Sequence, residues 1–221
     1  MTALGCNTYH IKRTNHIQNT QFKKIIDNST TAKKYKTYIE ACSKIRLEAD
    51  NNSIFANVAV EKIRLKRREL SKNNDSNSPL VRHAYIIDQI KRPQDSEKLK
   101  EVYGNQFILI SCHIDQKSAI DNLAARIAED NANLPRREKW ISHAADLVDQ
   151  DQMEEDIDHG QRVRQVFPLA DVIIDSNDDQ RSEVIIKRFF EALFGDFAIS
   201  PTKDEFFQNI AYNVSLTSCD T

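Results

Sequence analysis

Residues 81–113, "VRHAYIIDQIKRPQDSEKLKEVYGNQFILISCH", decide the fold. They contain two short, nearly unbroken apolar runs, Ala84–Asp88 and Phe107–Cys112, and the first of these stops at an acid. The residues between the runs place apolar side chains at helical spacing and reach Gly104, a residue type that favours the end of a helix. Continuous rather than alternating apolarity is typical of strands covered on both faces, as in a parallel sheet flanked by helices. The stretch therefore predicts a strand, a helix and a strand.

The same alternation of helices and strands extends along the chain. A third apolar run, Ala170–Asp175, precedes a helix predicted over 180–194. Further helices are predicted over Thr31–Ala49, capped by Thr30 or Thr31, and over Ser53–Leu70, capped by Ser53. A strand followed by a turn is predicted within 7–18. The side chains expected to face inward on the helices after the first and third runs are Leu99, Val102, Tyr103, Val184, Ile185, Phe189 and Leu193. The fold class is α/β, with an open, mostly parallel sheet flanked by helices.

Composition excludes several classes of protein. The chain has 221 residues, of which 40% are hydrophobic and 29% charged, and 31 basic against 33 acidic residues give a net charge of −2. No overall positive field attracts nucleic acid or an anionic membrane, and no apolar stretch is long enough to span a bilayer. The four cysteines stand far apart without a CxxC motif, which argues against a zinc knuckle or a disulfide framework. We expect a cytoplasmic protein with reduced thiols.

The acid that ends the first apolar run is the main candidate for a functional side chain. In open α/β sheets ligands lie beyond the carboxyl ends of the strands, so Asp88 is expected to face that crevice. An acid in this position commonly holds Mg²⁺ in phosphoryl-transfer folds, and Arg92 just beyond it is suited to pairing with a phosphate. The alternative, given equal weight, is that Asp88 caps the helix that follows.

Three quoted segments carry a resemblance to a known family. They are "HAYIIDQIKRPQDSEKLKEVYGNQFILISCHID", "GQRVRQVFPLADVIID" and "SPTKDEFFQNIAYNVSLTSCDT". Together they resemble the amino-terminal part of the bacterial anti-phage deoxycytidylate deaminases, from about residue 7 to the end. Those proteins join a P-loop, nucleotide-kinase-like domain to a zinc-dependent cytidine deaminase domain. The resemblance implies a kinase-like domain over 1–198 and the linker and start of a deaminase domain over 199–221.

The resemblance also assigns roles to segments and side chains. Residues 84–88 are similar to the strand that carries a Walker-B-like acid, 115–165 to a helical lid, and 203–218 to the opening helix of the deaminase domain. The apolar residues expected on the buried face of that last helix are Phe206, Phe207, Ile210, Ala211 and Val214. The side chains expected to contact a nucleotide are Asp88, Arg92, Arg126, Arg136 and Arg137.

Two motifs that the family's chemistry requires do not occur in the sequence. A phosphate-binding loop needs G-x-x-x-x-G-K-[ST], because glycine backbone must approach the phosphates closely. Zinc-dependent deamination needs H-x-E and P-C-x-x-C, since one His and two Cys hold the metal. We therefore expect a chain without its first strand and Walker A loop, with no catalytic residues and no metal ligands of its own. A Mg-nucleotide is the cofactor to consider here, and zinc belongs to the missing deaminase domain.

The alternative hypothesis is an inert interaction module that pairs with an intact deaminase or with a second copy of itself. Two local features are also compatible with either a binding role or a purely structural one. The basic run within "EKIRLKRRE", residues 61–69, suits a phosphate or an acidic partner, although solvated helix faces often carry such runs. His143 and His159 lie among acids in the charged region, where a metal site is the less common outcome, and Trp140 is expected to anchor the lid.

Overall fold

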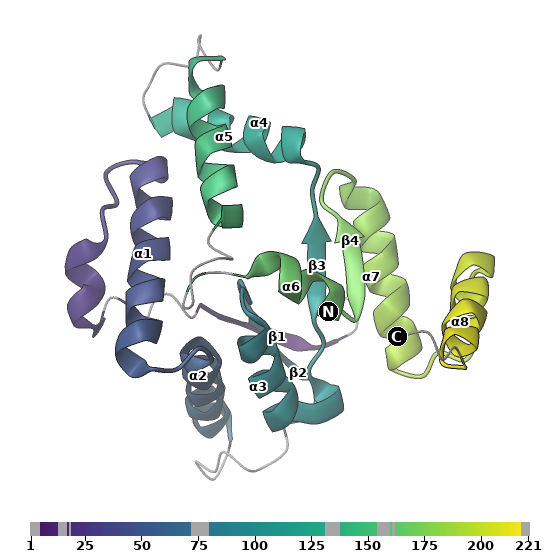
Figure 1. Ribbon diagram of the computed structural model, residues 1–221. Coiled ribbons are helices and arrows are strands. Elements are labelled where there is room, and N and C mark those ends of the chain that lie inside the picture. Colours follow the sequence, from purple (N-terminus) through teal and green to yellow (C-terminus); the bar gives the residue numbers. More distant parts are fainter. Residues whose placement is uncertain are drawn as a thin grey trace. The chain divides into compact units, whose positions relative to one another are not determined.

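The computed structural model describes residues 5–12, 17, 19–71, 80–130, 138–153, 160 and 162–217, and Figure 1 shows their arrangement. The strands are β1 (Asn7–Ile11), β2 (His83–Ile87), β3 (Ile110–His113) and β4 (Val172–Asp175). The α-helices are α1 (Thr31–Ala49), α2 (Ile54–Leu70), α3 (Pro93–Tyr103), α4 (Gln116–Asp130), α5 (Glu138–Met153), α6 (Val163–Val166), α7 (Asp179–Leu193) and α8 (Lys203–Ser215). Short 3₁₀ helices cover η3 (Gln21–Ile25), η4 (Gly104–Gln106) and η7 (Phe167–Leu169).

The strands confirm a mixed α/β protein with parallel pairing, which is compatible with the predicted open α/β class. β1 pairs with β2, in the register Tyr9 opposite Tyr85, and β3 pairs with β4, in the register His113 opposite Asp175. Within the described ranges these are two separate two-stranded sheets. Helix α3 connects β2 of one sheet to β3 of the other. The crossovers that parallel neighbours need contain α1 and α2 between β1 and β2, and α4 to α6 between β3 and β4.

Local signals set the ends of the first two helices. The Thr30 side chain accepts a hydrogen bond from the Lys33 backbone N–H, so α1 begins where the sequence predicts. Ser53 occupies the N-cap position of α2 but makes no side-chain capping bond. A buried acid from another element supplies it instead, since Asp95 Oδ1 of α3 accepts from the Ala56 N–H at 3.0 Å. Asp95 thus joins the starts of α2 and α3.

The core beneath the first sheet is apolar and lies where α2 and α3 meet the strands. Its buried members are Ile11, Ala56, Ala59, Ile63 and Leu99. The side chains packed around them include Tyr85, Ile87 and Tyr103. Leu99 is fully buried, as the helical spacing predicts, whereas Val102 on the same helix is exposed, contrary to the prediction. The helix turns only one face to the sheet, and Val102 lies just outside it.

Helices α4 and α5 form a hairpin that packs against α1 (Figure 1). Its small core contains Ala124, Ile127 and Ala144, and Trp140 packs against them as expected for an anchor. The backbone N–H of Thr31 at the start of α1 donates to the Asp130 carboxylate at the end of α4. Within the region predicted to be a lid, the described helices α4 and α5 are therefore joined to α1.

The chain divides into two compact units, Met1–Asn177 and Asp178–Thr221. The second unit consists of α7 and α8, so the division falls before the predicted boundary at residue 198. On α7 Phe190 is buried, while Val184 and Leu193 are exposed rather than inward as predicted. In the part of the chain that the structure describes, no helix has the length and apolar character needed to cross a membrane.

Helix α8 has no buried side chain, which corrects the expectation that one of its faces is buried. Its large apolar residues are exposed, among them Phe206 at 54%, Phe207 at 63% and Val214 at 63%. A capping box at Thr202 and Glu205 nevertheless fixes the first turn. Local capping therefore defines this helix, and no packed core contributes to it.

Candidate functional site

Asp88 lies directly after the last residue of β2, and it is exposed. The chain turns away from the strand at Gln89, whose φ of 63° is in the left-handed region that few side chains adopt. The N-cap of α3 is Arg92, four residues beyond Asp88, and the Arg92 side chain makes no capping bond. Asp88 therefore does not occupy the N-cap position of the next helix. Its carboxylate is placed at the carboxyl end of a parallel strand, where ligands of open α/β folds bind.

Arg92 is buried, with 1% of its surface exposed. Its guanidinium donates to the Gly160 carbonyl and to Gln94 Oε1, the latter at 3.3 Å. The Arg162 backbone N–H donates to the Lys91 carbonyl at 2.8 Å. In this structure Arg92 thus joins the start of α3 to the segment that leads into α6. The sequence gives no sign of this burial, because an Arg-Pro pair at a helix start is equally common at a surface.

Of the remaining predicted side chains, the structure describes Arg126 and places it on a different element from Asp88. Arg126 is exposed on α4, where its guanidinium lies 3.5 Å from the Tyr35 hydroxyl of α1. Arg136 and Arg137 lie outside the described residues. Asp88 and Arg92 are therefore the two predicted residues that share one turn, and Arg126 belongs to the packing of the hairpin on α1.

Two further acids lie at the carboxyl ends of strands, and sequence reasoning did not select them. Asp115 follows β3, and hydrogen bonds from the Ser118 backbone N–H hold the pKa of its carboxyl below the usual range. Asp175 is the last residue of β4, and its carboxylate accepts from the backbone and side-chain N–H groups of Asn177, both at 2.9 Å. The rule that selected Asp88, an acid after an apolar run, would have found both. In each case local turn and capping bonds engage the carboxylate.

Histidine and cysteine side chains make no metal site in the described part of the chain. Cys112 and His113 are exposed neighbours on β3, and the His113 ring meets Phe167 edge to face at 6.3 Å. His143 is similarly placed against Trp140 at 6.4 Å, and His159 lies outside the described residues. Among the residues described, no three His, Cys, Asp or Glu side chains lie close enough to hold a metal ion.

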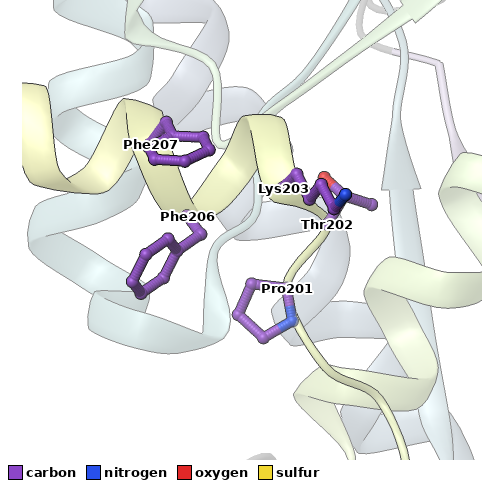
Figure 2. A pocket seen from close by; sticks show the side chains of 5 residues that line it. All are labelled: Pro201, Thr202, Lys203, Phe206 and Phe207. Carbon is purple, nitrogen blue, oxygen red and sulfur yellow. The ribbon is translucent and has the colours of Figure 1, made fainter.

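Surface hollows lie at two places among the described residues. One, of about 380 Å³, surrounds the first turn of α8, and its lining residues are Pro201, Thr202, Lys203, Phe206 and Phe207 (Figure 2). Figure 2 shows Pro201 in the segment leading into the helix and the two phenylalanine rings on the helix itself. The other hollow, of about 440 Å³, lies between β1 and α2. The first is lined mainly by apolar groups and suits a protein surface better than a phosphate.

The structure is that of a mixed α/β protein with parallel strand pairs, and acids lie at the carboxyl ends of several strands. No protein-family model, curated protein or solved structure matches the chain.

Proposed function

We propose that this chain is the nucleotide-sensing or domain-docking, P-loop-like part of a deoxycytidylate deaminase. In its full-length form such a protein deaminates dCMP or dCTP to dUMP or dUTP in anti-phage defence. One observation carries the proposal: the exposed carboxylate of Asp88 follows the carboxyl end of β2 in a parallel pair. Ligands of open α/β folds bind beyond such ends. The family resemblance of the three quoted segments supports the choice of ligand.

Asp88 would hold the Mg²⁺ of a Mg-nucleotide, directly or through a water molecule. The arginines predicted to contact phosphate remain candidates, and Arg92 would have to exchange its contact with the Gly160 carbonyl for a phosphate oxygen. The chain would not carry out the deamination, because the zinc-binding motifs that this reaction needs do not occur in its sequence. Zinc would belong to the deaminase domain.

Isothermal titration calorimetry of the full chain with dCTP and dCMP, with and without Mg²⁺, tests the proposal. We expect Mg²⁺-dependent binding that weakens at least about tenfold, or about 1.4 kcal/mol, in Asp88→Asn. The matched control is Glu101→Gln on α3, an exposed acid that pairs with Lys98 at 3.0 Å and should bind as the wild type does. Absence of binding to the wild type, or equal affinities for wild type and Asp88→Asn, would contradict nucleotide sensing at this site.

The second candidate function is an inert interaction module that pairs with an intact deaminase. The exposed apolar side chains of α8 favour it, because soluble monomers rarely present such a group of large apolar residues without a partner. Sedimentation of the chain with a purified deoxycytidylate deaminase tests this function. A complex that Phe207→Lys disrupts would support it, and separate sedimentation of the two proteins would exclude it.

A further inference from the structure

The side of β1 that faces away from β2 is an open strand edge within the described residues. The Asn7 backbone N–H donates to the Arg82 carbonyl at 2.8 Å, which places the backbone groups of Asn7 on the β2 side. Along a parallel ladder, alternate residues direct both of their backbone groups to the same neighbour. The N–H and C=O groups of Thr8 and His10 are therefore directed to the opposite side. We call this side the open edge of β1.

Lys12 lies one residue beyond the end of β1, and the Lys62 ammonium of α2 donates to its carbonyl at 2.5 Å. This contact joins α2 to the carboxyl end of the strand. Unpaired strand edges such as the open edge of β1 are templates for the addition of another strand.

Helix α2 forms the other wall of a groove lined by residues of β1. Four of its side chains lie at positions i, i+3, i+4 and i+7, which form one face of a helix. They are Lys62, Leu65, Lys66 and Glu69, and with residues 8–11 they line the hollow of about 440 Å³. We call these four side chains the α2 stripe. A strand edge beside a helix is the geometry in which domains bind extended peptides by strand addition.

The chemistry of the α2 stripe indicates the kind of peptide. Lys66 Nζ lies 5.3 Å from the centre of the Tyr9 ring and 2.7 Å from Glu69 Oε1, so its charge is held over the groove. Two ammonium groups against one carboxylate give the groove a net positive charge. Leu65 is 51% exposed and offers an apolar contact between the two lysines. Acidic side chains complement this surface.

We propose that the open edge of β1 and the α2 stripe bind an extended acidic peptide, which adds to β1 as a further strand. Its backbone would bond to Thr8 and His10, the groups that β2 leaves unpaired. Its acidic side chains, at alternate positions and so on one face of the strand, would meet Lys62 and Lys66. The proposal does not depend on the nucleotide site, which lies at the end of the other strand of this sheet.

Fluorescence anisotropy of the full chain with a labelled ten-residue peptide of alternating aspartate and valine tests the proposal. We expect binding that weakens about tenfold in Lys62→Gln/Lys66→Gln, since each exposed ion pair contributes about two- to fivefold. The matched control, Arg64→Gln/Arg68→Gln, removes the same charge from the opposite face of α2 and should change the affinity by less than twofold. Circular dichroism establishes that both double variants are folded.

Two further peptides distinguish strand addition from simple attraction of opposite charges. The same peptide with alternate backbone nitrogens methylated should not bind, because it keeps its charges but cannot form the ladder. A peptide of alternating lysine and valine should not bind either. In ¹⁵N NMR spectra the Thr8 and His10 amides should become protected from exchange when the acidic peptide is added. The proposal would be overturned if the methylated or basic peptide bound as tightly as the acidic peptide. It would also be overturned if a single-stranded oligonucleotide displaced the labelled peptide, or if Lys62→Gln/Lys66→Gln left the affinity unchanged.

Discussion

Asp95 is a fully buried acid at the start of α3, and its carboxylate accepts the Ala56 N–H of α2 at 3.0 Å. Helix starts leave backbone N–H groups unpaired, and a buried unpaired donor costs about 1–3 kcal/mol. The Ser53 side chain makes no capping bond, so the Asp95 carboxylate accepts a hydrogen bond from the first turn of α2 in its place. The position of α2 on α3 therefore depends on one side chain that is remote in sequence from the helix it caps.

We predict that Asp95→Ala lowers the free energy of unfolding by about 1–3 kcal/mol, from the lost buried hydrogen bond and the cavity left behind, although the Ala56 N–H keeps its bond to the Ser53 carbonyl at 3.0 Å. Urea denaturation followed by circular dichroism measures the change. The control is Glu97→Ala, an exposed acid in the same turn, which should stay within about 0.5 kcal/mol of the wild type. Equal stabilities of the two variants would show that the buried carboxylate contributes nothing beyond an ordinary surface acid.

The residues of the candidate site differ in how far the sequence predicts their positions. The place of Asp88 follows from the apolar run before it, since a strand that ends in an acid must direct that acid to the strand's carboxyl end. The burial of Arg92 does not follow, because it depends on the Gly160 carbonyl, which is 68 residues away in the chain. A side chain whose partner is remote in sequence leaves no local pattern.

At the scale of elements, an ion pair joins α8 to α7. The Arg188 guanidinium of α7 lies 2.6 and 2.8 Å from the two carboxylate oxygens of Glu205. This contact, followed by the Thr202 backbone N–H, holds the pKa of Glu205 at about 2. The ordinary value is 4.5, so the folded pKa is lowered. The contribution of the pair is thus present above about pH 4.5 and is lost as the pH falls toward 2.

We predict that an NMR titration of the Glu205 carboxyl in the full chain gives a midpoint near 2, and that α8 loses helicity between pH 4.5 and 2. In Arg188→Met the midpoint should rise toward 4.5, because the guanidinium no longer stabilises the ionised form. Lys187→Met removes a neighbouring cation that pairs with Glu191 instead, at 3.8 Å, and should leave the midpoint unchanged. A wild-type midpoint near 4.5 would show that the pair does not persist in solution.

Elements with local signals are predicted best. Helix α1 begins and ends where the sequence places it, because Thr30 caps its start and the apolar spacing continues to Ala49. The strands are found near their predicted positions, but their separation into two sheets is not predicted. Apolar runs predict strands covered on both faces, whereas Ile86 of β2 and Ile173 of β4 are exposed, and such runs contain nothing that specifies which strand is the neighbour. The buried face of α7 also differs from the predicted one, since Phe190 is buried and Leu193 is exposed.

At the scale of the whole molecule, burial is distributed unequally between the two units. In the first unit, α3 presents three fully or nearly fully buried side chains, Asp95, Ser96 and Leu99. In the second, α8 presents none. Local opening is easiest where it exposes little apolar surface, so α8 should open far more often than α3. Covering α8 with a partner would remove this difference.

We therefore predict that backbone amides of α8 exchange with deuterium at least about a hundredfold faster than those of α3, relative to the unfolded chain. A hundredfold requires about 2.7 kcal/mol, which burial of one leucine side chain and its surroundings supplies. Mass spectrometry of the full chain measures both helices in one sample, with the acid-unfolded chain as the reference for intrinsic rates. Equal protection of α3 and α8 would mean that the apolar side chains of α8 are already covered in the free protein. Slowing of α8 alone on addition of a deoxycytidylate deaminase would identify the helix as the docking element of the second candidate function.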